Sequence, residues 1–313
     1  SPAGLGTWTD VCTDTTSPYS CSFDTTLVTD GLYDFRAIST DNAGNTATSA
    51  TVTNRRVDNT LPTASLTDPG AYLRLTVTLN ATATDVGGSG VLNVAFERSP
   101  ASAGTWTNIC TDTTSPYSCS FDTTAAGDGV YDLRSVTTDN AGNQAASVVA
   151  NRTIDNTAPT ASDIQTANAD ATVGRPETND TITFTYSEQI LASSILAGWT
   201  GASQAVTVRI NNSGNNDQLA VWNAANTALL PLTSTFVTLD GNNVQNNVVF
   251  AATMVQSGAS ITVTLGTLTS GIVRTDTGTS TMSWPPSATA TDLAGNPCST
   301  TTANETGAAD ANF

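Results

Sequence analysis

The residue types that usually carry out catalysis are scarce in this chain. It contains no His and no Lys, so the commonest general base and metal ligand and the usual Schiff-base nucleophile are both absent. Acids are abundant, yet nearly all stand in Asx-Gly turns or on strand faces expected to point outward. Glycoside hydrolysis, by contrast, needs two carboxylates facing each other across a cleft. We therefore predict no catalytic residue and a protein that is not an enzyme.

Calcium is the ligand chemistry that the acids fit best. Ca²⁺ prefers oxygen ligands from Asp, Asn and backbone carbonyls. The candidate ligands lie beside turns or junctions and are Asp41, Asp58, Asp139, Asp155 and Asp292. The alternative is that these side chains only cap backbone amides in Asx turns. We interpret Glu188 as a structural acid rather than a catalytic one, because it ends an alternating strand.

The cysteines predict an oxidising compartment. Cys12 and Cys21 recur as Cys110 and Cys119 with the same spacing and the same Ser-Pro-Tyr-Ser turn between them. That arrangement predicts two short hairpin disulfides, although two free buried thiols in each repeat are the alternative. A metal site is disfavoured because no further Cys or His completes a tetrahedral set. Cys298 is left without a predicted partner.

The cysteines belong to a longer repeat. Its best-marked part reads DGLYDFRAISTDNAGN at 30–45 and DGVYDLRSVTTDNAGN at 128–143. Side chains alternate between the two faces of a strand, so Tyr131, Leu133, Ser135 and Thr137 should share one face, the core face. The Asp-Gly-x-Tyr start resembles the tyrosine corner of immunoglobulin-like domains, which makes Tyr33 and Tyr131 structural residues.

The repeats are joined by short, proline-stiffened junctions. Val57–Pro62 reads VDNTLP and Ile154–Pro159 reads IDNTAP. This junction and the Asp-Asn-Ala-Gly-Asn turn, each present twice and in the same order, resemble tandem bacterial Ig-like domains of secreted or cell-surface proteins. The resemblance implies an all-β fold of immunoglobulin-like sandwiches arranged end to end.

Three domains are expected on this pattern. Residues 59–155 form a complete domain, in which 72–82 and 90–98 read as long strands. Residues 1–58 form an incomplete copy that lacks the counterparts of those strands. We expect the missing strands to come from upstream sequence or, by strand complementation, from a neighbouring molecule or another copy.

Residues 156–313 form a larger, divergent domain. Alternating runs at 181–188 and 261–265 predict strands, and 190–199 predicts one or two helical turns. The Tyr186–Ile190 run and the Asp292–Pro297 turn resemble another bacterial Ig-like family. A long Asn-rich insertion at 211–247 has no predicted place.

The net charge limits the classes of partner that the chain is expected to bind. The formal net charge is −17, which argues against nucleic acid and anionic membranes, because both demand a cationic surface. No apolar run is long enough to cross a bilayer. We predict an extracellular stalk, spacer or filament segment whose partners are neighbouring Ig-like domains. The alternative is an adhesin module that binds glycan or protein on exposed aromatics, namely Trp199, Trp222 and Trp284.

Overall fold

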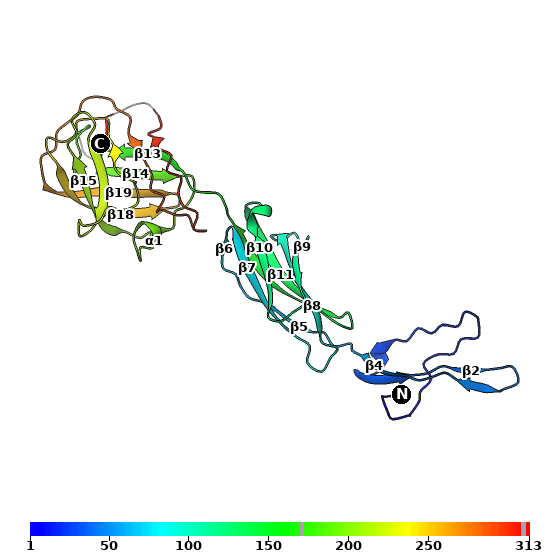
Figure 1. Ribbon diagram of the computed structural model, residues 1–313. Coiled ribbons are helices and arrows are strands. Elements are labelled where there is room, and N and C mark those ends of the chain that lie inside the picture. The colour runs from blue at the N-terminus through cyan, green and yellow to red at the C-terminus, as the bar shows by residue number, and fades with distance from the viewer. Residues whose placement is uncertain (170–171, 308–310) are drawn as a thin grey trace. The chain divides into compact units, whose positions relative to one another are not determined.

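The computed structural model describes residues 1–169, 172–307 and 311–313, and its regular secondary structure consists almost entirely of strands (Figure 1). The chain divides into two compact units, Ser1–Ile154 and Asp155–Phe313. The first unit contains both copies of the repeat. The further division between residues 58 and 59 stays a prediction.

The second repeat is a two-layer sandwich. One sheet has the order β10-β7-β5 and the other the order β6-β12-β11-β8-β9. Their bounds are β5 (Thr63–Leu66), β6 (Tyr72–Leu73), β7 (Thr76–Thr84), β8 (Val91–Pro100), β9 (Thr107–Asp112), β10 (Tyr117–Asp122), the 3₁₀ turn η2 (Thr123–Ala125), β11 (Gly129–Asp139) and β12 (Gln144–Ile154).

Between the two layers lies a core supplied by alternate residues of each strand. On β11, Leu133, Ser135 and Thr137 are fully buried and Tyr131 is half-buried, so the predicted core face is confirmed. Leu79 from β7 and Phe96 from β8 are also fully buried. Burying each such large apolar side chain contributes roughly 1.5–3 kcal/mol.

The strand predicted over 72–82 is wrong in one respect, because it breaks in the middle. Tyr72–Leu73 pairs in parallel with β12 in one sheet, whereas Thr76–Thr84 lies between β5 and β10 in the other. At the crossover Leu75 takes a positive φ of 52° and is 53% exposed. Alternation continues in the sequence across this point, which is why periodicity alone missed the change of sheet.

The first repeat has strands but no second layer. Its elements are η1 (Thr25–Leu27), β1 (Gly31–Phe35), β2 (Ile38–Thr40), β3 (Thr46–Thr48) and β4 (Val52–Val57). They form two separate two-stranded ladders, β1-β4 and β2-β3. Among the described residues, none of the side chains before Val57 joins a buried hydrophobic cluster.

The second unit contains a single nine-stranded sheet, ordered β13-β14-β19-β18-β15-β16-β17-β20-β21. The strands are β13 (Ala161–Ala167), β14 (Thr181–Tyr186), β15 (Gln204–Asn211), β16 (Gln218–Asn223), β17 (Val237–Thr238), β18 (Val248–Ser257), β19 (Ser260–Ser270), β20 (Ser283–Trp284) and β21 (Ala303–Asn304). The sheet curls until its two ends meet, where Gln165 Nε2 donates to the Thr306 carbonyl at 2.8 Å.

A large aromatic core fills the curled sheet. Trp284 is fully buried and packs edge-on against Phe184 and Tyr186, at centroid distances of 5.1 and 4.8 Å. The predicted helical turn is α1 (Ala192–Ile195). The insertion at 211–247 adds β16 and β17 to the sheet rather than forming a separate face.

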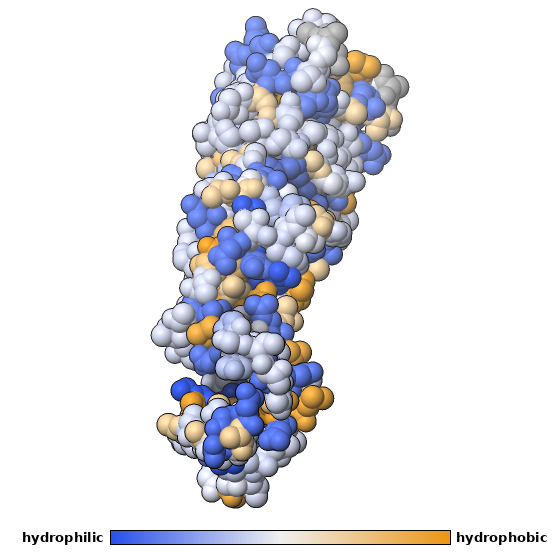
Figure 2. Space-filling view, turned by 90° about the vertical axis from the view of Figure 1, so that its right-hand side faces the viewer, coloured by the Kyte–Doolittle hydropathy of each residue, from blue (hydrophilic) through white to orange (hydrophobic). Residues whose placement is uncertain are grey.

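The surface is largely hydrophilic. On the face shown in Figure 2, apolar side chains reach solvent only in scattered groups. In the part of the chain that the structure describes, no helix has the length and apolar character needed to cross a membrane.

Candidate metal centres

Two clusters of three carboxylates are built alike, one in the second repeat and one in the unit Asp155–Phe313. The first is Asp58, Asp85 and Asp139; the second is Asp155, Glu188 and Asp292. In each cluster, one carboxylate oxygen from every residue lies within 4.8 Å of the others. Three negative charges this close repel one another strongly unless a cation lies between them.

Three chain segments distant in sequence build the first cluster. Asp58 follows β4 on the segment leading to β5, Asp85 begins the turn after β7, and Asp139 is the last residue of β11. Asp139 is fully buried and Asp58 nearly so. The cluster therefore exists only when the junction and both turns are in place.

The turn after β11 holds the Asp139 carboxylate rigidly. Its Oδ1 accepts from the backbone amides of Ala141 and Asn143, at 2.9 and 2.8 Å, and its Oδ2 accepts from Asn143 Nδ2 at 2.8 Å. Burial alone would raise the pKa of Asp139, but the hydrogen bonds from Asn143, Ala141 and Gly142 outweigh it and hold the pKa below its ordinary value. Asp139 is therefore ionised under ordinary conditions.

The turn after β7 leaves one oxygen free for a ligand. Asp85 Oδ2 accepts from the Gly90 amide at 2.6 Å, whereas Asp85 Oδ1 is buried and has no hydrogen-bond partner. Buried carboxylate oxygens without a partner are costly. A Cβ at Gly88 would lie 2.2 Å from that oxygen, so the turn needs glycine there.

The second cluster repeats the hydrogen bonding of the first. Asn296 Nδ2 donates to Asp292 Oδ2 at 2.8 Å and to the Asp155 carbonyl at 3.0 Å. Asn143 Nδ2 does the same for Asp139 Oδ2 and the Asp58 carbonyl, at 2.8 and 3.0 Å. The asparagine four residues after the turn Asp thus ties the turn to the junction in both domains.

Sequence reasoning found four of the six cluster residues. It missed Asp85, and it treated Glu188 as a structural acid, although the structure brings Glu188 to Asp155 and Asp292. The signal available was position: both residues follow a core strand, β7 or β14, by one or two residues. Without the fold, nothing indicated that these strand ends meet the junction.

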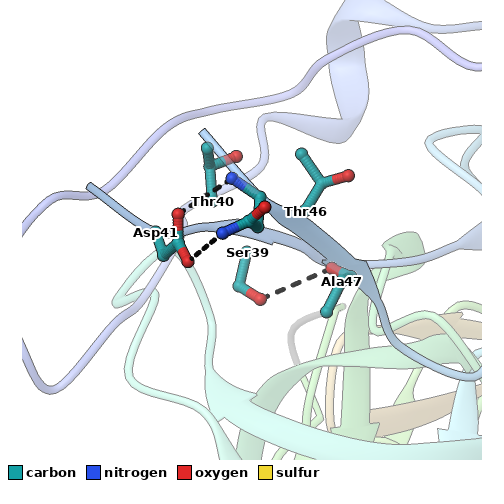
Figure 3. A pocket seen from close by; sticks show the side chains of 6 residues that line it. Ser39, Thr40, Asp41, Thr46 and Ala47 are labelled. Carbon is teal, nitrogen blue, oxygen red and sulfur yellow. Dashed lines mark hydrogen bonds between the residues drawn. The ribbon is translucent and has the colours of Figure 1, made fainter. Parts of the chain in front are cut away.

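Asp41 lies apart from the other predicted calcium ligands. Its turn is built like that of Asp139, with Asn45 Nδ2 donating to Asp41 Oδ2 at 2.8 Å (Figure 3). These hydrogen bonds, led by the one from Asn45, lower the pKa of Asp41. The residue is exposed, however, and among the described residues it belongs to no carboxylate cluster.

Both predicted disulfides are present, but the Cys110–Cys119 bridge does not join the two paired strands of a hairpin. Cys110 lies on β9 of the five-stranded sheet and Cys119 on β10 of the three-stranded sheet, with Cα atoms 6.1 Å apart. The bridge therefore joins the two layers instead of two paired strands. In the first repeat Cys12 is bonded to Cys21 with the same sequence separation, and their Cα atoms are 6.0 Å apart.

The two tyrosines make hydrogen bonds of the kind found in a tyrosine corner. Tyr131 Oη donates to the Ala126 carbonyl at 2.7 Å, and Tyr33 Oη donates to the Thr29 carbonyl at 2.9 Å. Each bond ties the start of a strand to the loop before it.

The aromatic residues suggested for ligand binding are mostly core residues. Trp199 and Trp284 are buried, so neither offers a face to a ligand. Trp222 is half-buried, and the Arg209 guanidinium stacks 3.7 Å from its ring centroid.

Cys298 is a buried free thiol, and burial together with the Glu188 charge raises its pKa to about 11.

Comparison with known proteins matches residues 62–258 to models of bacterial immunoglobulin-like domains. Residues 62–134 match the family described as "Bacterial Ig domain", and residues 115–258 match "Bacterial Ig-like domain (group 3)". No curated protein matches.

Four solved structures match the chain. One comes from work titled "Ca2+-stabilized adhesin helps an Antarctic bacterium reach out and bind ice". It is 16% identical, with a TM-score of 0.27 over 80% of this chain. The chain spans 58% of that protein's length.

Proposed function

Because residues 62–258 carry tandem bacterial Ig-like domains, we propose that the chain is a non-enzymatic extracellular segment, a stalk or spacer of a bacterial surface protein, stabilised by calcium at its domain junctions. The observation that carries this proposal is the recurrence of the same carboxylate cluster at the start of two successive domains.

The donor set favours calcium over other ions. The side-chain ligands would be carboxylates alone, with backbone carbonyls such as those of Asp58 and Asp155 nearby. Zinc would prefer His or Cys, and the chain has no His. Calcium accepts six to eight oxygens in adaptable geometry, whereas magnesium demands a near-octahedral arrangement. The buried, unpaired Asp85 Oδ1 supplies one oxygen that protein donors leave unsatisfied.

A bound ion would stabilise the segment by adding to the hydrogen bonds that already link the junction to the two turns. In the first cluster it would connect the junction residue Asp58 to the turns of Asp85 and Asp139. Without the ion, mutual repulsion of the three carboxylates would loosen these turns. An ion that binds only the folded state raises its stability by mass action.

Thermal unfolding of the full chain with calcium and with a chelator tests this proposal. We expect millimolar Ca²⁺ to raise the Tm, and Asp139→Asn and Asp292→Asn each to reduce the rise, because each removes a charge from one cluster. Asp41→Asn is the matched control, since it changes an equivalent turn outside any cluster. An unchanged Tm together with no heat of Ca²⁺ binding would refute the proposal.

The adhesin alternative has less support within the domain concerned. Two of its three candidate aromatics, Trp199 and Trp284, are buried. Only Trp222 retains an exposed part, and Arg209 covers one face of its ring. Glycan-array binding that is lost on Trp222→Ala would favour an adhesin over a spacer.

A further inference from the structure

The first repeat has an open β edge where the second repeat has a strand. In the second repeat, β11 pairs with β12 on one side and with β8 on the other. In the first repeat, β1 pairs with β4. Along its other edge the described residues place the short segment Ser1–Ala3, with the bridge from Pro2 to Tyr33 that is equivalent to the pair Pro100–Tyr131. The open edge therefore begins where the rest of a β8-like strand would pair.

Apolar side chains that are buried in the second repeat are exposed in the first. Tyr117 is 8% exposed and pairs with Ala81 of β7, whereas its counterpart Tyr19 is 73% exposed. The same contrast holds for the cysteine two residues later, since Cys119 is 3% exposed and Cys21 is exposed. In the second repeat these two residues lie beside β7 in the same sheet, where Tyr117 pairs with Ala81 and Cys119 with Leu79.

The charge of Arg36 predicts that the missing strand carries an acidic side chain. In the second repeat Arg134 stacks on Trp106 and pairs with Glu97 of β8 at 2.5 Å. Its counterpart Arg36 stacks on Trp8 with its guanidinium carbon 4.1 Å from the ring centroid. Among the described residues Arg36 has no carboxylate partner. A strand bearing an acid at the Glu97 position would complete the pair.

The turn at Asp41 in the first repeat has different surroundings from its counterpart at Asp139 in the second repeat. In the second repeat the turn after β11 is held by the loop before β8, where Asn140 N donates to the Gly90 carbonyl at 2.9 Å and Ala141 N to Ser89 Oγ at 3.0 Å. The equivalent turn of the first repeat instead borders an open pocket lined by Ser39, Thr40, Asp41, Asn45, Thr46 and Ala47 (Figure 3).

We propose that the open face of the first repeat binds the front half of another Ig-like repeat, a segment with the residue pattern of residues 58–98, which in the second repeat forms β5, β6, β7 and most of β8. Its β7-like strand pairs beside Tyr19 and Cys21, and its β8-like strand pairs with β1 and presents an acid to Arg36. The segment also brings counterparts of Asp58 and Asp85 to Asp41. This last step rests on the proposed calcium function and makes a third ion site.

A graft in the full chain tests the docking. A second copy of residues 58–98 is placed directly before Ser1, which restores the order Arg98–Ser99 found in the second repeat. Hydrogen exchange of the amides in β1 and β4 is measured by mass spectrometry, and we expect it to slow at least about tenfold. The control graft carries Leu79→Asp and Phe96→Asp in the copied segment alone and should give no protection. Protection of equal size by both grafts would overturn the proposal.

Calcium separates the docking from the ion site. Protection in chelator that increases with Ca²⁺, with the increase lost on Asp41→Asn, supports both parts. Protection that Ca²⁺ leaves unchanged supports docking and overturns the third ion site. If the fused segment docks poorly because of its linker, a synthetic peptide of residues 58–98 added to the full chain serves as the second probe. Absence of protection by peptide and graft alike would refute docking, whatever the calcium response of the other two clusters.

Discussion

The two copies of the repeat have nearly the same sequence but different structures. Equivalent positions carry Tyr19 and Tyr117, or Phe35 and Leu133, yet only the second copy buries them. The first copy still forms its disulfide, its 3₁₀ turn and its strand pair β1-β4. Local structure is therefore encoded within each copy, whereas burial depends on strands such as β7 and β8, which are present in the second copy and not in the first.

The same comparison applies to the carboxylates. Asp41 and Asp139 stand in turns with matching hydrogen bonds. Asp139 is fully buried beside two further acids, and Asp41 is exposed with none. The turn geometry that both copies share thus orients one candidate ligand, Asp41 or Asp139. The neighbouring segments determine whether other acids lie close enough to form a metal site.

The largest expected difference between the copies concerns the core position at the middle of the tyrosine-corner strand. Leu133→Ala should destabilise the second repeat by about 2–5 kcal/mol, because it leaves a cavity at a fully buried site. Phe35→Ala should cost roughly 0–1 kcal/mol, since the first repeat has no core to lose. Hydrogen exchange of the full chain, followed repeat by repeat, measures both. A comparable loss in both copies would show that the first repeat has a core.

Removal of the disulfides should give the second largest difference between the two copies. Replacing Cys110 and Cys119 with Ser opens a nine-residue separation and removes a link between two sheets, so we expect a loss of about 2–3 kcal/mol in urea unfolding. The same change at Cys12 and Cys21 should leave the unfolding midpoint of the second repeat unchanged. Cross-linked peptides that join the two repeats, found by non-reducing mapping, would contradict the pairing on which this comparison depends.

The tyrosine hydroxyls should differ by less. Tyr131→Phe removes a partly buried hydrogen bond to the Ala126 carbonyl, so it should cost roughly 0.5–1.5 kcal/mol. Tyr33→Phe removes a solvent-exposed one to Thr29 and should be close to neutral. Chemical denaturation of the paired variants is the measurement. A larger cost at Tyr33 would mean that the first repeat is covered in solution.

The smallest effect is expected in the acid dependence. The pKa of Asp139 is held below its ordinary value in the folded state, so its contribution is present above the unfolded pKa and is lost as pH falls through the lower folded value. In chelator, Asp139→Asn should flatten the stability of the second repeat below about pH 4. Asp41→Asn should leave that profile unchanged. Identical profiles for Asp139→Asn and the parent chain would refute this assignment.

Much of the architecture followed from the sequence alone. Alternation located the core face of β11, and the duplicated spacing identified both disulfides. These features depend on residues close in the chain, so a local pattern contains them. The absence of His and Lys likewise limits the chemistry before any fold is known.

Only the tertiary structure decided which acids act together. Asp85 and Glu188 stand near strand ends with nothing local to distinguish them, and Asp41 has the same turn as Asp139. The structure adds Asp85 and Glu188 to the clusters and leaves Asp41 out. The layer-to-layer course of the Cys110–Cys119 bridge was hidden for the same reason. The carboxylate clusters and the disulfide both depend on which strands pack across the sandwich. Contacts between segments far apart in sequence produce no periodic pattern in the sequence of either segment.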